Sequence, residues 1–307
     1  MTVWNWLALG GAAVVALVVV VETRRRLVRS TPGRRFFRHP TAAPGIFVLA
    51  FFVTIAVAAP AVAPFPPYHQ IDITRANQPP SPRHPLGTDF LSRDVWSRLA
   101  YGARISLSIG TLAMVVAVTV GAAVGAVAGY FGRWVDAVLM RLVDVALAMP
   151  RIFVLLMAVA LWDYLPLWVL VLLIGLTGWF GTSRLVRAEV LSLREREFVA
   201  AAQALGAGPA RIIFRHVLPN AAAPIIVSAA LGIGNVMLLE AGLSFLGLGV
   251  PSPAPSWGNM IADGMGKMAV AWWSATFPGL AISLVVMALN AVGDALRDAL
   301  DPRREAA

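Results

Sequence analysis

Seven long apolar runs divide this 307-residue chain and leave little choice of fold. Each run is close to the roughly 20 residues that a helix needs to cross the hydrocarbon core of a bilayer. Hydrophobic residues make up 59% of the chain and charged residues 13%, a balance far too apolar for a soluble domain. We therefore predict an all-α polytopic membrane protein with spans at about 3–21, 45–64, 107–130, 145–162, 165–182, 222–246 and 273–292.

The basic residues indicate how the chain is threaded through the membrane. One arginine-rich block at 24–38 follows the first apolar run, and another lies in the loop at 184–221. Because basic loops favour the cytoplasmic side, we expect the N-terminus outside the cell and the C-terminus in the cytoplasm. The first run is not a cleavable signal peptide, since its basic residues follow it instead of preceding it. The formal charge of +9 resides in blocks between spans, which argues against a nucleic-acid partner.

The polar segment at 197–220 predicts a helical elbow between two spans. Four residues recur at i, i+3, i+4 and i+7 and would form one apolar stripe on a short helix: Phe198, Ala201, Ala202 and Leu205. Gly206 is expected to end that helix in the left-handed conformation, and Pro209 suits the first turn of a second helix. The second helix would end at Leu218 and Pro219. A rigid elbow of this kind is suited to docking into a groove of a soluble partner.

The second arm of the elbow carries two like charges, Arg211 and Arg215, at i and i+4. Such a pair slightly destabilises an isolated helix, so both side chains are expected to meet anions. Lipid phosphates and acidic residues of a partner are the two candidates.

The outer loop contains the sequence HPLGTD, which has the pattern of a tight turn. Proline restricts His84 to extended geometry, Gly87 permits a positive φ, and Asp89 would cap a helix over 90–103. We expect His84, Gly87 and Asp89 to lie in a region of extracytoplasmic docking and gating. A plain structural turn is the alternative.

Small residues on the third span predict close helix packing. Tandem small-xxx-small spacing lets the backbone of another helix approach three residues: Gly121, Gly125 and Gly129. A small-for-small change such as Gly125→Ala is expected to be tolerated there.

Two charged residues fall inside predicted spans, where a charge needs a partner or water. Glu240 is the intramembrane acid, with substrate contact as one possible role. Arg151 follows Pro150 in the fourth run. Either that span starts near Pro150 and Arg151 reaches the cytoplasmic interface, or Arg151 lines the substrate route.

No catalytic or cofactor site is predicted. A phosphate-binding loop needs G-x-x-x-x-G-K-[ST], and the only lysine, Lys267, has Ile261 where the first glycine should be. Cysteine is absent, and the four histidines lie in separate loops, so no metal site is expected. We expect this chain to bind no ATP, magnesium or other cofactor itself.

Several stretches besides the elbow resemble one protein family, and they occur in that family's order. They are HPLGTD at 84–89, YGARISLSIG at 101–110, LSFLGLG at 243–249, PSWGNM at 255–260, FPGLAI at 277–282 and GDALRDALDPR at 293–303. With A-A-x-A-L-G-A at 201–207, the chain resembles the permeases of ABC importers from about 45 to 303. The resemblance is to the C-type permeases of the dipeptide, oligopeptide and nickel branch.

The resemblance implies a type I ABC-importer permease fold (MetI-like). That branch usually has six spans, so residues 1–22 would be an extra N-terminal transmembrane helix. It assigns ATPase coupling to the loop at 184–221, through Phe198, Ala200, Ala201, Ala202, Ala204, Leu205, Gly206, Arg211, Ile213, Arg215, Leu218 and Pro219. It also implies an ion pair or gate at Glu240.

Three positions depart from the family pattern. Ala200 stands in place of the usual glutamate of the elbow, and Gln203 in place of the usual arginine. Docking by shape is expected to persist without the salt bridges of those two positions. Ser92 stands where relatives usually have glycine, so the outer loop is expected to differ there.

The organisation that follows has an extra helix and arginine-rich linker at 1–44, a first core span and outer loop at 45–104, a permease core at 105–303 and a tail at 304–307. By resemblance, the partners are a second related permease, two cytoplasmic ABC ATPases that bind ATP and magnesium, and an extracytoplasmic solute-binding protein. The expected function is import of di- and oligopeptides across the bacterial cell membrane. Alternatives are uptake of nickel chelates or other small solutes, a secondary transporter, and a membrane-embedded enzyme; no internal repeat supports the second, and no intramembrane acid cluster supports the third.

Overall fold

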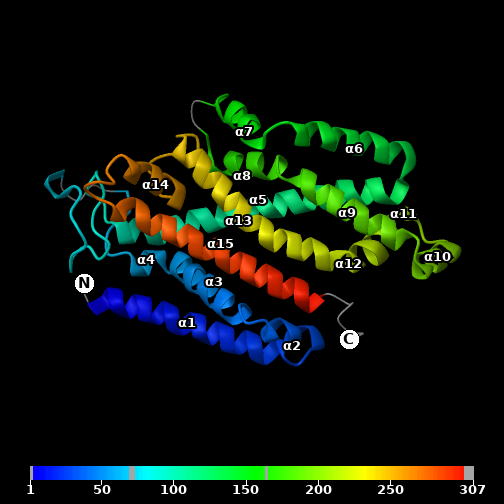
Figure 1. Cartoon of the computed structure of the whole chain (residues 1–307), viewed down its shortest axis with the longest axis horizontal. Coiled ribbons are helices and arrows are strands. Elements are labelled where there is room, and N and C mark those ends of the chain that lie inside the picture. The colour runs from blue at the N-terminus through cyan, green and yellow to red at the C-terminus, as the bar shows by residue number, and fades with distance from the viewer. Residues whose placement is uncertain (1–2, 69–72, 163–164, 301–307) are drawn as a thin grey trace.

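The structure is a computed structural model that describes residues 3–68, 73–162 and 165–300. Side chains are described for the same residues except 3–9 and 73. This part of the chain is built of helices, and an isolated bridge between Thr88 and Asp94 is its only β-pairing. The helices form an elongated bundle (Figure 1). The prediction of an all-α protein is confirmed.

The helices follow one another with short connections, except in the outer loop before α5. In chain order they are α1 (Val3–Leu27), α2 (Thr31–Arg38), α3 (Ala42–Val57), α4 (Ala59–Val62), the 3₁₀ turn η1 (Ile73–Arg75), α5 (Val95–Phe131), α6 (Arg133–Ala148), α7 (Arg151–Val159), α8 (Leu167–Leu176), α9 (Trp179–Arg194), α10 (Glu197–Ala204), α11 (Pro209–Ile212), the π-helical turn η2 (Ile213–Val217), α12 (Leu218–Asn220), α13 (Ala222–Phe245), α14 (Trp257–Met265) and α15 (Trp273–Leu300).

The two ends of the bundle carry different elements. In Figure 1, α4, α14 and the start of α1 lie at one end, which we call the outer end. The elements α2 and α10 and the last turn of α15 lie at the opposite end, which we call the inner end. α5 runs through the middle and has 37 residues. At 1.5 Å per residue it is about 55 Å long, well beyond the roughly 30 Å of a bilayer core.

The membrane spans are partly single helices and partly bent pairs. Among the described residues, α5, α13 and α15 are each long and apolar enough to cross a membrane, and the total reaches six if each of three bent pairs is one span. The pairs are α2 with α3, α6 with α7, and α8 with α9. The first predicted span lies in α1, but its side chains at 3–9 fall outside the described residues. The count of seven therefore stays a prediction.

The fourth and fifth predicted spans are wrong as single helices. α6 and α7 are bent by 82° where Met149 and Pro150 take extended backbone. Proline lacks the N–H that a continuous helix needs and disfavours helical geometry in the residue before it. α8 and α9 are bent by 42° at Thr177 and Gly178. The first break is exposed, with Met149 52% exposed, whereas Thr177 and Gly178 at the second break are partly buried. Both breaks leave backbone groups free to bind side chains or solute.

The glycine stripe of α5 packs against α9, as the spacing predicts. A Cβ placed on Gly121 would lie 2.7 Å from Thr182 Cβ, and one on Gly129 would lie 2.9 Å from the Arg187 carbonyl oxygen. At Gly125 an added Cβ would overlap the Ser183 carbonyl oxygen. The two helices therefore touch through their backbones. The expectation that Gly125→Ala is tolerated is wrong, because even one methyl group has no room.

We predict that Gly125→Ala destabilises the protein by about 1–3 kcal/mol, because overpacking forces α5 and α9 apart. Gly279→Ala on α15 is the matched control, since an added Cβ there meets nothing within 4 Å. It should be neutral or stabilise by up to about 1 kcal/mol. Thermal unfolding of both variants in detergent is the measurement. Equal melting temperatures would contradict the backbone contact.

Candidate functional site

The elbow at the inner end is anchored by a small apolar cluster. Val199 and Ala202 of α10 are 0% and 7% exposed and pack with Val186 and Val190 of α9. The predicted stripe is therefore shifted by one position. Phe198 and three further members of the predicted docking set on α10 are exposed: Ala200, Ala201 and Ala204. The periodicity locates a helix, but only the position of α9 decides which side is covered.

Gly206 ends α10 as predicted, in the left-handed conformation with φ +78°. Gly206 N donates to the Gln203 carbonyl oxygen and Ala207 N donates to the Ala202 carbonyl oxygen. This is the double hydrogen bond of a Schellman motif, which satisfies carbonyls left over at the end of a helix. The turn is thus rigid, and it sets the angle between the two arms of the elbow.

The second arm differs from the prediction at its end. Pro219 does not stop the helix, because it occupies the first turn of α12, where its missing N–H is not needed. The preceding turn η2 is π-helical: Leu218 N donates to the Ile213 carbonyl oxygen. Asn220 Nδ2 then donates to the His216 carbonyl oxygen at 2.6 Å. The chain passes from the elbow almost directly into α13.

The outward surface of the elbow is apolar. Leu205, Phe214 and Phe198 are 89%, 72% and 39% exposed. Arg211 and Arg215 are exposed near them. We call these exposed side chains together the elbow surface. The helices α10 and α11 that carry the elbow project from the inner end of the bundle (Figure 1). Large exposed apolar side chains of this kind are typical of a protein-binding surface.

A cavity of about 990 Å³ opens between α5, α9, α13 and α15. Its size is at the upper end of the range for sites that bind small molecules, about 300–1,000 Å³. Its lining includes Arg151, Glu189, Arg196, Asn235 and Arg297. We call it the inner cavity. Another cavity, of about 300 Å³, lies between α3, α5 and α15, and its lining is apolar.

Arg151 lies at the break between α6 and α7 and lines the inner cavity. Its Nη2 donates to the Ile174 carbonyl oxygen at 2.5 Å, and its Nε donates to Thr177 Oγ1 at 3.2 Å. The choice between the two predicted positions of Arg151, at the cytoplasmic interface or on the substrate route, stays a prediction. Helix α7 does start after Pro150, as predicted, but it has only 9 residues.

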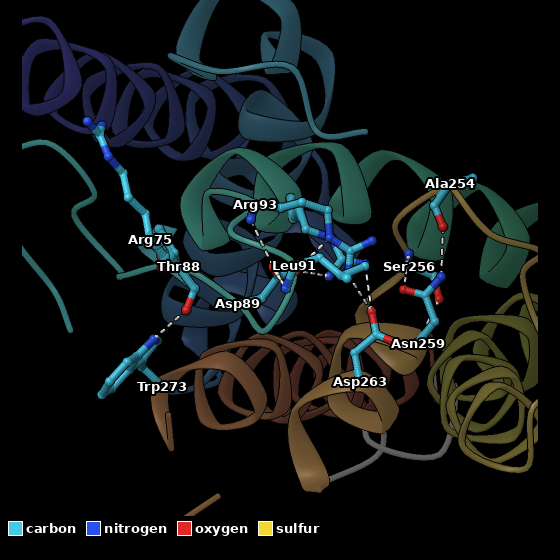
Figure 2. Close-up of polar contacts among 11 residues, drawn as sticks. Arg75, Thr88, Asp89, Leu91, Arg93, Ala254, Ser256, Asn259, Asp263 and Trp273 are labelled. Atoms are coloured by element: carbon cyan, nitrogen blue, oxygen red, sulfur yellow. Dashed lines mark hydrogen bonds and ion pairs between the residues drawn. The ribbon is translucent and has the colours of Figure 1, made fainter. Parts of the chain in front are cut away.

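A compact charge cluster at the outer end, which we call the outer cluster, consists of Asp89, Arg93, Arg98 and Asp263. Figure 2 labels three of them, Asp89, Arg93 and Asp263. Asp89 Oδ2 accepts from Arg93 Nε at 2.7 Å and from Arg98 Nη1 at 2.6 Å. Asp263 of α14 accepts from both guanidinium groups at 3.0 Å. Two acids and two bases thus neutralise one another, and they join the outer loop to α5 and α14.

The outer loop also corrects the predicted start of α5. Asp94, not Asp89, is the cap: Asp94 Oδ2 accepts from Ser97 N at 2.7 Å, and the helix begins at Val95. Asp89 instead accepts from the backbone N–H groups of Leu91 and Arg93. Ser92, between Asp89 and Asp94, has a left-handed backbone conformation. A right-handed helix cannot continue through such a residue, so α5 does not begin at Phe90 as predicted.

Two positions in this loop have positive φ. Gly87 has φ +79°, as the turn pattern predicts, and Ser92 has φ +61°. An L-residue pays about 1–2 kcal/mol for that conformation, whereas glycine adopts it freely. The positive φ is the physical reason why glycine suits the position that Ser92 occupies in this chain.

His84 and Asp89 are 1% and 2% exposed, so neither side chain is accessible to a docking protein. His84 Nδ1 lies 3.0 Å from Asp94 Oδ1 and its ring stacks near Phe65. The arrangement fits the alternative interpretation, a structural turn. A role of the surrounding loop in gating stays a prediction.

Glu240 is buried in α13 and does not form the expected ion pair with any described residue. Its Oε1 accepts hydrogen bonds from Ser244 Oγ at 2.7 Å and Ser256 Oγ at 2.8 Å. Ser256 is also the N-cap of α14, in a capping box with Asn259. Glu240 therefore ties α13 to α14, and at 1% exposure it does not line either cavity.

The described residues contain no group of three or more His, Cys, Asp or Glu side chains that could hold a metal ion. His69, one of the four histidines, falls outside the described residues.

Comparisons with known proteins identify the family. The family model described as "binding-protein-dependent transport system inner membrane component" matches residues 117–306. The chain belongs to this family of permeases. A second model, the N-terminal transmembrane domain of oligopeptide transport permease C, matches residues 33–80. The permease has the type I importer fold, and α1 is an additional N-terminal helix that precedes both matched segments.

Curated relatives match the permease along most of its length. A dipeptide transport system permease protein of Alkalihalophilus pseudofirmus is 42% identical over 278 residues, which are 89% of this chain and 90% of the relative. A putative peptide permease protein of Brucella suis is also 42% identical, over 275 residues, with the same two coverages. The oligopeptide transport system permease protein of Bacillus subtilis is 38% identical over 271 residues, 88% of each chain.

Sequence reasoning missed three members of the outer cluster in this permease: Arg93, Arg98 and Asp263. Asp89 and Arg93 are four residues apart, a spacing that signals a local pair. No comparable signal links Arg98 to Asp263, which is 165 residues away. Two ion pairs between α6 and α9 were missed for the same reason: Arg187 with Asp136, and Arg184 with Asp144.

We predict that Asp263→Ala destabilises the permease by about 2 kcal/mol, because Arg93 and Arg98 are then left with Asp89 alone. The value is at the low end for such a change, since the Asp263 side chain is 31% exposed and water screens it. Asp294→Ala, an exposed site on α15, should change stability by less than about 0.5 kcal/mol. Thermal unfolding in detergent distinguishes the two. A fall in melting temperature no larger than that of Asp294→Ala would contradict the cluster.

Proposed function

We propose that this permease is a transmembrane subunit of an ATP-driven importer that carries di- and oligopeptides into the cell. The observation that carries the proposal is similarity over 88–89% of the chain: the relatives at 38–42% identity are described as dipeptide, oligopeptide or peptide permeases. The inner cavity supports it, since about 990 Å³ is enough for a short peptide.

The partners follow from what the chain has and lacks. The sequence contains no phosphate-binding loop, and membership of the permease family supports two cytoplasmic ABC ATPases as the subunits that bind ATP and magnesium. The elbow surface, with Leu205 and Phe214 exposed, is the docking site for one of them. A second related permease completes the path, and an extracytoplasmic binding protein delivers the solute. Membrane lipid surrounds the exposed apolar side chains of the spans.

The inner end of the bundle faces the cytoplasm of the bacterial cell. The arginine blocks at 24–38 and 184–215 both lie toward this end, and basic segments favour the cytoplasmic side. The N-terminus is then outside and the C-terminus inside. This orientation places the elbow surface in the same compartment as ATP.

Transport proceeds by alternating access. The elbow is rigid at Gly206 and is packed onto α9 through Val199 and Ala202, so a force on the elbow surface moves α9 as well. Helix α9 lines the inner cavity. ATP binding to the ATPases and arrival of the loaded binding protein each stabilise one conformation over the other, which is what any ligand-driven switch requires.

The function is tested with the complete transporter in proteoliposomes. We predict ATP-dependent accumulation of labelled trialanine when the permease, its second permease, the ATPases and the binding protein are all present. Omitting this chain should abolish uptake. The isolated chain should hydrolyse no ATP, because it has no phosphate-binding loop. ATP turnover by the isolated chain, or uptake without it, would overturn the assignment.

We predict that Gly206→Val uncouples the transporter, because a β-branched residue at φ +78° costs on the order of 1–2 kcal/mol and re-aims the elbow. An added Cβ at Gly206 meets nothing within 4 Å, so the effect is conformational and not a clash. The protein should be recovered at near-normal levels, but peptide uptake or ATPase co-purification should be lost.

Gly208→Val is the matched control for this variant. It lies in the same turn with equally open space, but its φ is −71°, which valine adopts without strain. Normal uptake with Gly206→Val would show that the elbow is not the coupling element.

A further inference from the structure

Arg151 has more hydrogen-bonding capacity than its surroundings use. A guanidinium has five N–H donors. Two of them are used, by the Ile174 carbonyl oxygen and by Thr177 Oγ1, and both acceptors are uncharged. No carboxylate of the described residues is within ion-pair distance of Arg151. A cation at membrane depth without an anion is costly, and such residues mark solute pathways by default.

The surroundings hold this side chain at the cavity wall. Both helix breaks meet here: Arg151 starts α7 after the 82° bend, and Thr177 and Gly178 form the 42° bend. A Cβ on Gly178 would lie 2.8 Å from Arg151 Nη2, so glycine leaves the space that the guanidinium occupies. Broken helices around a polar group are a common construction of solute sites in transporters.

The depth of Arg151 in the cavity sets it apart from the other charged lining residues. Glu189, Arg196 and Arg297 come from the ends of α9 and α15 and the start of α10, at the inner mouth. The guanidinium of Arg151 instead lies beside Gly178 and Ala117, and Ala117 is near the midpoint of α5. Among the lining residues of the described chain, it is the one charged side chain at that depth.

We propose that Arg151 binds the C-terminal carboxylate of a peptide during its passage through the inner cavity. This rests on the proposed function. A permease that accepts peptides of many sequences can rely only on groups that all of them share, and the terminal carboxylate is one such group. A guanidinium binds a carboxylate in a bidentate manner, with geometry that ammonium groups do not provide.

The test compares trialanine with trialanine amide, which differ only at that carboxylate. The complete transporter is used in proteoliposomes, as wild type and as Arg151→Gln. The variant should lower uptake of trialanine about tenfold, the usual effect of losing one charge-assisted pair, and that of the amide less than twofold. The binding protein is the same in both samples, so its own preference cancels in the comparison. Arg151→Lys should keep part of the preference for trialanine over trialanine amide.

Arg141→Gln is the control, because Arg141 is an exposed residue of α6 outside the cavity. It should change neither uptake. If Arg151 only held the end of α8, Arg151→Gln would lower both uptakes equally, and that result would overturn the proposal. So would a variant with unchanged uptake of both peptides. Failure of the wild type to transport either peptide would instead overturn the proposed function.

A second measurement keeps Arg151 in place. The chain contains no cysteine, so Ser228→Cys in the cavity lining gives a single thiol in this subunit. Trialanine should slow labelling of that thiol by a methanethiosulfonate reagent at several-fold lower concentration than trialanine amide does. Equal protection by the two peptides would overturn the proposal even if Arg151→Gln failed to assemble.

Discussion

The backbone contact between α5 and α9 is the constraint on which the inner half of this permease depends. Gly121, Gly125 and Gly129 let two helices meet where any side chain would hold them apart. One face of α9 packs against α5. Other residues of α9 line the inner cavity and pack against α10. The coupling element and the solute path therefore share a single helix, which is the simplest physical route from one to the other.

The outer half depends on a different interaction, the partly buried pairing of two acids with two arginines. Asp89 and Asp263 are far apart in the sequence, and the neutral cluster they form with Arg93 and Arg98 joins the outer loop to α14. Glu240 then connects α14 to α13 through Ser256. Breaking such a network would leave a buried charge without a partner, so the outer loop, α13 and α14 are expected to stay together.

The elbow shows how far local patterns reach. The left-handed conformation of Gly206 follows from the residue itself, because only glycine adopts it without strain, and the prediction is confirmed. The buried side of α10 does not follow from the pattern. Val199 is covered and Phe198 is exposed because α9 packs against one side of α10. The spacing of residues within α10 does not specify which side that is. The pattern also fails to predict that the helix continues through Pro219, directly after the π-helical turn η2.

The sequence by itself determined the membrane class, the helical content, the permease family, the turn at Gly206 and the packing role of the glycine stripe. The membrane class, the helical content, the turn and the glycine stripe depend on residue composition or on spacing within one helix, whereas the family was recognised by the resemblance of several short motifs along the chain. Tertiary structure alone decided the partners of Asp263, the hydrogen bond from Ser256 of α14 to Glu240 in place of an ion pair, and the position of Arg151 on the cavity wall. These depend on which helices meet in three dimensions, and contacts between residues far apart in sequence leave no local pattern to read.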